Sequence, residues 1–309
     1  MTNLMPKRRI GSLEVSVVGL GCNNFGGRID EAASAAVVNA ALDAGVTFFD
    51  TADSYGGTRS EEILGRAIGK RRPDVVIATK FGSRLDDERK GAAPAYVKRA
   101  LEDSLRRLGT DYVDLYQLHW PDPETPVGDT LGALADAVRE GKAREIGCSN
   151  FSVAQLKEAA AAAEGAPRFV SVQNEYSLLE RAPEKGVLAE CEREHIAFIP
   201  YFPLKSGVLS GKYRRGEAPP AGTRIGGMPA ERREQLLSDA TMTTIEALTA
   251  YAEKHGHNLL ELAIAWLLAK PAVASVIAGA TKPGQVRANA EAAAWALSLD
   301  ETAEVDAIA

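Results

Sequence analysis

The sequence is poor in cysteine and contains no long apolar run. Its three cysteines, Cys22, Cys148 and Cys191, form no CxxC pair and no disulfide framework, which is typical of a protein from a reducing compartment, the cytoplasm. No apolar run reaches the roughly 20 residues that span a bilayer, so we expect no membrane segment. The basic stretch from Met1 to Ile10 has no apolar segment behind it and does not predict a secretory signal.

Histidine is also scarce, and neither sign of charge dominates. Of the four histidines, His255 and His257 are two residues apart, a spacing that turns them to different faces of a helix, so we expect no metal site. The 36 basic and 42 acidic residues give a formal charge of −6, which argues against a nucleic-acid surface. A small molecule is the expected partner, and the oligomeric state is left open.

What the sequence does have is a regular alternation of short apolar runs and helical segments. Most of the runs are apolar on both sides, as parallel strands covered by helices must be. They recur about every 25 to 40 residues, the size of a βα unit. Eight such units predict an α/β fold, a (β/α)8 TIM barrel, as a single domain over residues 1–309. The expected strands are Val15–Leu20, Thr47–Asp50, Val75–Thr79, Val113–Leu118, Ala143–Gly147, Phe169–Val172, Ile196–Pro200 and Ala274–Ile277.

Three further features accompany the predicted barrel. Arg8–Val15, around Gly11 and Ser12, predicts an N-terminal β-hairpin that plugs the bottom of the barrel. Lys205–Gln235, after the seventh strand, predicts a long loop that either covers a cofactor or is a disordered excursion. Helices are expected at Glu31–Asp43 with Asp30 as cap, Ala95–Leu108, Val153–Ala163 with Ser152 as cap, Asp239–His255 and Leu259–Ala269.

Four side chains with acid–base chemistry follow consecutive predicted strands. Asp50 and Tyr55 come after the second strand, Lys80 after the third and His119 after the fourth. Because parallel strand ends converge on one mouth of a barrel, these side chains can share a pocket. Taken singly, each has a commoner structural explanation, such as a cap, surface packing or a core histidine. Four such residues at three consecutive strand ends favour an active site over these separate explanations.

Together these residue types suit the reduction of a carbonyl by hydride transfer, which needs a proton donor and a group that orients the carbonyl. A free tyrosine, with a pKa of about 10, donates poorly at neutral pH. An ammonium about 4 Å away favours the phenolate, so we expect Lys80 to lower the pKa of Tyr55. Asp50 balances the charge of Lys80, and neutral His119 donates a hydrogen bond to the substrate oxygen.

Several motifs, in order along the chain, resemble those of the aldo-keto reductase superfamily. They are FFDTADSYG, SEEILGRAI, IATKFG, LYQLHWPD, IGCSNF, VQNEYS and IPYFPLKSGVLSGKY, and the resemblance runs from about Ile10 to about Ala293. It implies a catalytic tetrad of Asp50, Tyr55, Lys80 and His119, with Tyr55 as the proton donor in reduction.

The same resemblance implies where a nicotinamide cofactor binds. Ser149, Asn150 and Gln173 match residues that hold the carboxamide, and Tyr201 matches an aromatic residue that stacks on the nicotinamide ring. Lys282, beside Thr281 at a helix N-terminus, favours NADPH, with NADH also possible. At Gly279 and Gln285, better-known vertebrate members carry lysine and arginine, so the strength of the NADPH preference stays open, and Lys282 and Arg287 have solvated helix charges as their alternative. The remaining cofactor residues that we expect are Gly21, Leu204, Ser206, Gly207, Lys212 and Asn289.

The turn after the first strand has two interpretations. Gly19-Leu20-Gly21 begins like a Rossmann fingerprint, but Gly26 and Gly27 come too late and Asp50 lies further on than the usual distance of about 20 residues. In the family that the sequence resembles, this turn lines the pocket. Expected pocket residues, each with simple packing as its alternative, are Asn23, Asn24, Phe25, Phe81 and Trp120.

The favoured function is NADPH-dependent reduction of aldehydes or ketones to alcohols. One alternative is NAD(P)-dependent oxidation of a sugar or secondary alcohol, since the chemistry is reversible. A second is a channel-associated redox-sensing subunit, because some members of the family that the sequence resembles have that role. The sequence does not name the physiological substrate.

Overall fold

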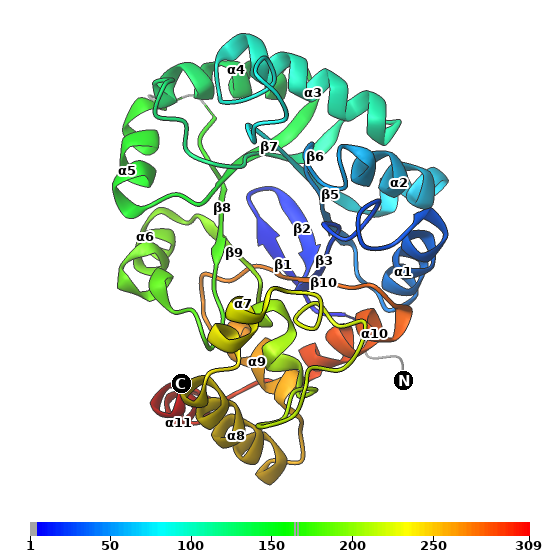
Figure 1. Cartoon of the computed structure of the whole chain (residues 1–309). Helices are drawn as coiled ribbons and strands as arrows, with labels where there is room; N and C mark the ends of the chain where they lie inside the picture. Colours follow the sequence, from blue (N-terminus) through cyan, green and yellow to red (C-terminus); the bar gives the residue numbers. More distant parts are fainter. Residues whose placement is uncertain (1–4, 164, 166) are drawn as a thin grey trace.

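Eight parallel strands curl into a barrel in a computed structural model that describes residues 5–163, 165 and 167–309 (Figure 1). They follow the order β10-β3-β4-β5-β6-β7-β8-β9, and the ring is completed where Phe198 of β9 pairs with Val273, just ahead of β10. The predicted (β/α)8 barrel is confirmed. Its strands are β3 (Val18–Gly21), β4 (Phe48–Asp50), β5 (Val76–Phe81), β6 (Val113–Leu118), β7 (Ala143–Ser149), β8 (Ser171–Glu175), β9 (Ala197–Tyr201) and β10 (Val276–Gly279).

Helices pack around the outside of the strands and begin where the sequence supplies caps. Asp30 accepts a hydrogen bond from the backbone N–H of Ala33 at the start of α1, and Ser152 forms a capping box with Gln155 at the start of α5. Both caps were predicted. The helices are α1 (Glu31–Asp43), α2 (Arg59–Ile68), α3 (Pro94–Leu108), α4 (Val127–Arg139), α5 (Val153–Ala162), α6 (Val187–Glu194), α7 (Ala230–Leu236), α8 (Asp239–Lys254), α9 (Leu259–Leu268), α10 (Pro283–Glu291) and α11 (Leu299–Ile308).

The predicted N-terminal hairpin consists of β1 (Lys7–Ile10) and β2 (Leu13–Ser16), which lie at the centre of the ring in Figure 1. Ile10, Leu13 and Val15 are buried in one cluster with barrel residues such as Phe48. The hairpin therefore plugs the barrel, as expected. Because Val15 belongs to this plug, the predicted strand Val15–Leu20 is wrong at its start, and the first barrel strand begins at Val18.

Several strands run further toward the mouth than hydrophobicity predicted. Lys80 lies inside β5, paired with Gln117, and Gln173 lies inside β8, paired with Ile199. Parallel pairing uses backbone groups only, so polar side chains continue the strands where they line the mouth. The strand ends that differ from the expected ones are Gly21, Phe81, Ser149, Glu175, Tyr201 and Gly279.

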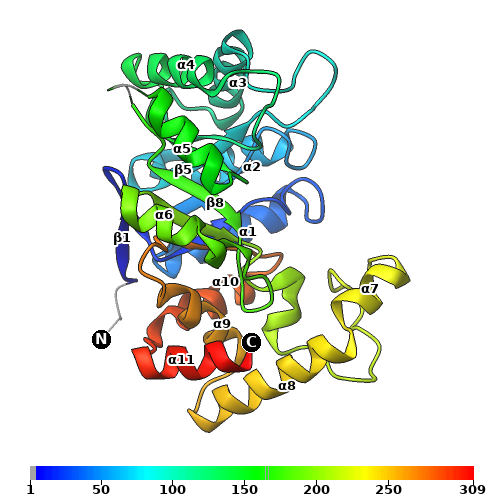
Figure 2. The same cartoon turned by 90° about the vertical axis from the view of Figure 1, so that its left-hand side faces the viewer.

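The predicted loop after the seventh barrel strand lies at the end of the barrel opposite the hairpin (Figure 2). It contains two short helical segments, the 3₁₀ segment η3 (Lys205–Ser210) and α7, which the sequence analysis did not predict. The other 3₁₀ segments are η1 (Gly69–Asp74), η2 (Ala182–Lys185) and η4 (Ala292–Ala294).

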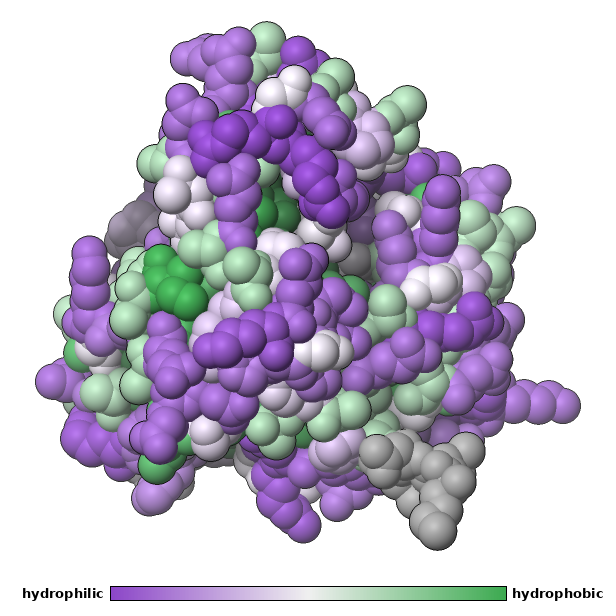
Figure 3. All heavy atoms as spheres, turned by 90° about the horizontal axis from the view of Figure 1, so that it is seen from below, coloured by the Kyte–Doolittle hydropathy of each residue, from purple (hydrophilic) through white to green (hydrophobic). Residues whose placement is uncertain are grey.

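Hydrophilic side chains cover most of the face shown in Figure 3, and apolar side chains are scattered over it. Among the residues that the structure describes, the large hydrophobic side chains classed as exposed are Trp120, Phe202 and Leu299. No helix in that part of the chain is both long enough and apolar enough to cross a membrane.

Candidate active site

A buried ion pair forms the centre of the site. Lys80 and Asp50 are 0% and 2% exposed, and the Nζ atom of Lys80 lies 2.5 Å from Oδ2 of Asp50. The amine also donates to the backbone oxygen of Thr51 at 3.0 Å. Burial lowers the pKa of Lys80, but its interactions with Asp50 and then Tyr55 together outweigh burial, so the pKa is raised and the amine stays protonated.

Tyr55 completes this group from the loop after β4. Its hydroxyl lies 3.4 Å from Nζ of Lys80, and its ring meets the imidazole of His119 edge-on at 5.7 Å between centroids. The pKa of Tyr55 is raised, because burial outweighs the attraction of the Lys80 ammonium for the phenolate. Our expectation of a lowered pKa is therefore wrong in direction. Tyr55 is a protonated phenol at neutral pH, with an ammonium beside it.

His119 follows β6 and is held as a neutral imidazole. Burial, and then the charge of Lys80, lower its pKa to about 3. Its Nδ1 atom shares a 3.0 Å hydrogen bond with the hydroxyl of Ser83, a residue that the sequence analysis missed. The only signal for Ser83 is its position directly after the IATKFG motif.

The second oxygen of Asp50 accepts hydrogen bonds from two glutamine side chains. Nε2 of Gln173 lies 2.9 Å from Oδ1 of Asp50, and Nε2 of Gln117 lies 3.4 Å from it. Gln173 was expected to hold a carboxamide; here its amide nitrogen orients the catalytic candidate Asp50. Gln117, buried on β6, was not expected at all, because a strand-interior glutamine gives no sequence signal of its own.

Three of the expected cofactor residues, from the ends of β7 and β9, form one chain of hydrogen bonds. Tyr201 donates to Oδ1 of Asn150 at 2.8 Å, and the amide nitrogen of Asn150 donates to the backbone oxygen of His119 at 3.0 Å and to the hydroxyl of Ser149 at 3.1 Å. Asn150 has φ of 62°, a left-handed conformation that asparagine tolerates better than most residues. The network places an amide, a hydroxyl and an aromatic ring beside the Tyr55 pocket.

A second group of expected cofactor residues lies near the ends of β3 and β10 and on α10. Gly21 pairs with Gly279 across these two strands, and a Cβ atom built on Gly279 would lie 3.2 Å from side-chain atoms of Asn23 and Asn24. The side-chain oxygen of Gln285 accepts from both the backbone N–H and the hydroxyl of Thr281. Lys282 precedes α10, where it is exposed, and Asn289 is buried on that helix.

The long loop brings positive charge to the mouth. Ser206 and Gly207 have positive φ, and a Cβ atom built on Gly207 would lie 2.8 Å from Nζ of Lys212. Burial, followed by repulsion from Arg28, lowers the pKa of Lys212 and of Arg224. Within the described residues none of these three cations forms a salt bridge. Leu204 lies half-buried just before η3.

These unpaired cations indicate an anion site. Arg224 also reaches Oδ1 of Asn24 at 3.4 Å. The sequence analysis missed Arg28 and Arg224, because only the fold brings Arg28 near enough to repel both Lys212 and Arg224. The donor set of glycine-lined strand ends, amides and unpaired cations fits a dinucleotide with its phosphates.

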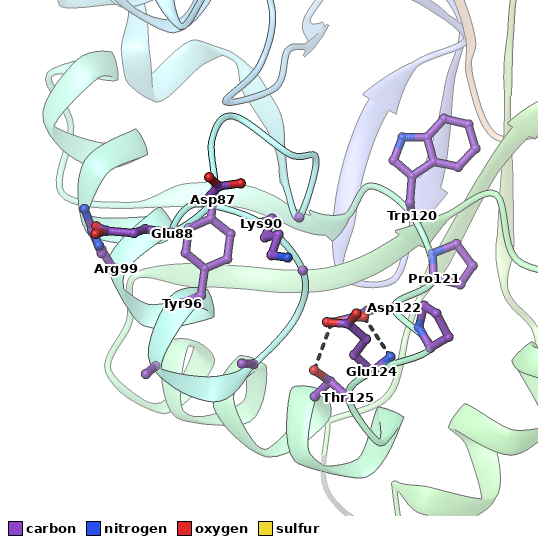
Figure 4. Close-up of a pocket in the computed structure, with 15 residues that line it drawn as sticks. Asp87, Glu88, Lys90, Tyr96, Arg99, Trp120, Pro121, Asp122, Glu124 and Thr125 are labelled. Atoms are coloured by element: carbon purple, nitrogen blue, oxygen red, sulfur yellow. Dashed lines mark hydrogen bonds between the residues drawn. The ribbon is translucent and has the colours of Figure 1, made fainter.

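A cavity of about 590 Å³ opens between the segments after β5 and β6 (Figure 4). Trp120 on its wall is 51% exposed and stacks on His119 with 6.0 Å between ring centroids. Asp122 joins the two segments, since it accepts hydrogen bonds from the backbone N–H of Ala92 at 2.7 Å and from the hydroxyl of Thr125 at 2.9 Å. The lining of this cavity includes none of Asp50, Tyr55, Lys80 and His119, so its connection to the acid–base group is through the contact of Trp120 with His119.

Two expected rim residues are not at this rim. Phe25 and Phe81 are both 0% exposed and pack in the core, where Phe81 stacks on Tyr116, so packing is their role in this structure. Asn24 lies beside the end of β10, where it donates to the backbone oxygen of Ala280 at 3.2 Å. Of the five expected pocket residues, only Trp120 lines the cavity.

Fold and site together define a (β/α)8 barrel with a buried acid–base cluster at the mouth. The family model for the aldo/keto reductase family matches residues 17–309. The chain belongs to the aldo/keto reductase family, whose members are oxidoreductases that use NAD(P)H.

Individual relatives show how broad this family is. Over 307 residues the chain is 34% identical to "Aldo-keto reductase YhdN" of Bacillus subtilis, with 96% of this chain and 90% of the relative covered. Over 279 residues it is 37% identical to "Probable voltage-gated potassium channel subunit beta" of Oryza sativa, with coverage of 87% and 84%. The solved structure of the glycerol dehydrogenase AKR11B4 from Gluconobacter oxydans is similar with a TM-score of 0.84 and 31% identity, over 98% of this chain and 94% of that one.

Proposed function

We propose that this protein reduces aldehydes or ketones to alcohols with NADPH as the hydride source. The observation that carries the proposal is the contact of one amine, Lys80, with both Asp50 and Tyr55, beside a neutral imidazole. The bound reduced nicotinamide supplies the hydride. A spectrophotometric panel of carbonyl substrates with NADPH and with NADH tests it, and the absence of turnover throughout the panel would contradict it.

Each side chain then has one task. Tyr55 donates its proton to the developing alkoxide, and the Lys80 ammonium stabilises the phenolate that remains. Asp50 keeps that ammonium protonated and in place. The hydroxyl of Ser83 donates to Nδ1 of His119, which leaves Nε2–H free to donate to the carbonyl oxygen and set its angle.

The residues proposed for the cofactor divide between its two ends. Ser149, Asn150 and Tyr201 hold the nicotinamide end, because their network lies beside Tyr55 and His119. Lys212, Arg28 and Arg224 neutralise the phosphates of the linker, and Lys282 at the start of α10 binds the phosphate that distinguishes NADPH from NADH.

We expect Lys282→Ala to weaken NADPH binding about tenfold, the scale of one lost charge-assisted hydrogen bond, and to leave NADH binding unchanged. Dissociation constants from the fluorescence of the reduced nicotinamide measure both. Lys254→Ala, at the exposed end of α8, is the matched control and should change neither. Equal loss of NADPH and NADH affinity would assign Lys282 another role.

The cavity beside His119 is proposed to hold the part of the substrate that does not react. Removing the indole of Trp120 should raise KM several-fold, because a large exposed aromatic ring is lost from the wall, and should change kcat less. The control Leu299→Ala removes an exposed side chain on α11, distant in sequence. An unchanged KM for every substrate turned over would show that Trp120 does not touch the substrate.

Oxidation of an alcohol is the second candidate, favoured by the similarity to the solved structure of a glycerol dehydrogenase. The same residues serve it, with Tyr55 accepting the proton. Initial rates in both directions at equal cofactor concentrations decide between the two. We do not propose association with a channel, because the acid–base set of an enzyme is present here and the channel name belongs to the rice relative.

A further inference from the structure

A buried carboxyl group in the segment that carries Tyr55 has no role in the proposed reaction. Asp53 is 1% exposed, and neither of its carboxylate oxygens has a hydrogen-bond partner in the part of the chain that the structure describes. Buried polar groups are almost always paired, so this exception needs a physical explanation. An ionised carboxylate in this position would lose its hydration without compensation.

The nearest charged groups leave no free cation for Asp53. Glu61 of α2 is 0% exposed and accepts hydrogen bonds from the hydroxyl of Thr79 at 2.5 Å and from Nε of Arg107, on α3, at 2.6 Å. Arg107 is thus already paired with one carboxylate. An ionised Asp53 would add a second negative charge, which would repel Glu61 and compete with it for Arg107.

The remaining groups that face Asp53 are two phenols and one amine. Tyr96 of α3 and Tyr116 of β6 are neutral, because burial raises the pKa of each. Lys80 of β5 is in contact with Asp50. In keeping with this, burial and then repulsion from the Glu61 carboxylate raise the pKa of Asp53 from 3.8 to about 7, against the smaller opposite effects of Arg107, the backbone N–H of Ser54 and Lys80.

The backbone at Asp53 is attached to the catalytic strand. Its N–H donates to the backbone oxygen of Lys80 at 3.0 Å, while the Lys80 amine donates back to the backbone oxygen of Thr51. The N–H of Tyr55 donates to the backbone oxygen of Ala52 at 3.2 Å. These hydrogen bonds therefore connect the backbone at Asp53 to Lys80, and the same short segment carries Tyr55.

We propose that Asp53 is a positioning residue that stays a neutral carboxylic acid within the segment that carries Tyr55, and so leaves Asp50 as the one carboxylate that acts on Lys80. This inference rests on the proposed carbonyl reduction. Ionisation of Asp53 places a second negative charge near Lys80, weakens the stabilisation of the Tyr55 phenolate, and so slows proton donation.

The test compares the pH dependence of kcat for the wild type and Asp53→Asn, which keeps the shape and is always neutral. As pH rises through about 7, wild-type kcat should fall about tenfold, the effect of one charge over about 10 Å at an effective dielectric of about 20. Asp53→Asn should lack that fall. The same fall in both proteins, or an equal loss at every pH in the variant, would overturn the proposal. Asp111→Asn, an exposed aspartate ahead of β6, is the control and should follow the wild type.

Thermal stability provides a measurement that needs no turnover. Because the pKa of Asp53 is higher in the folded chain, the unfolded chain releases the proton first as pH rises, so wild-type stability decreases up to about pH 7 and then levels off. Between about pH 5 and 7.5 the unfolding constant should rise about 10²-fold more in the wild type than in Asp53→Asn. Parallel curves would show that Asp53 is not a neutral acid. Diverging curves without turnover of any carbonyl would support the neutral acid and contradict the proposed reaction alone.

Discussion

Tyr55→Phe should lower kcat for a model aldehyde by at least about 10²-fold, the usual scale of a general acid, and leave the NADPH dissociation constant nearly unchanged. The substitution removes only the hydroxyl, which lies 3.4 Å from the Lys80 amine. The ring keeps its edge-on contact with His119. Steady-state kinetics together with a binding titration separate the two effects.

A matched control is Tyr251→Phe, which removes a hydroxyl on α8 that contacts Glu304. It should keep wild-type turnover. If Tyr55→Phe also kept it, Tyr55 would have no part in proton donation, and another group at the mouth would have to be the acid.

Lys80→Met should be comparably damaging to turnover, by about 10²-fold or more, because the phenolate of Tyr55 loses its ammonium. It should also lower the free energy of unfolding by about 3–5 kcal/mol, because Asp50 is left buried with an uncompensated charge. Denaturant unfolding and steady-state kinetics measure the two effects independently.

The double variant Asp50→Asn with Lys80→Met separates stability from chemistry. It removes both charges, so it should recover most of the lost unfolding free energy without recovering turnover. Recovery of activity in the double variant would show that Lys80 matters only as the partner of Asp50.

The order of strands and helices, and the residues of the main acid–base group, could be predicted from the sequence because they depend on local patterns. Short apolar runs separated by capped helices predicted the barrel, and strand-end positions predicted the meeting of Asp50, Tyr55, Lys80 and His119. These predictions needed only the period of hydrophobicity and the rule that parallel strand ends converge. That residues 1–309 form one domain stays a prediction.

Other parts of the site depend on packing that no local pattern encodes. Phe25 and Phe81 have the composition of a pocket rim, yet both are fully buried. Ser83 and Gln117 have ordinary local contexts, but they reach His119 and Asp50 across strands. We predicted the wrong direction for the pKa shift of Tyr55, because the sequence reveals the neighbouring charge but not the burial that removes water from the phenol.

The sequence by itself determined the barrel, its family and the four chemical groups that meet at its mouth, since strand order and residue type are properties of the chain. Only the tertiary structure decided which of those groups are shielded from water and, among the residues that it describes, which cations form no salt bridge and that the Asp53 carboxyl has no hydrogen-bond partner. Burial and charge balance arise from residues far apart in the chain, and they act on pKa values only once the surrounding elements have excluded water.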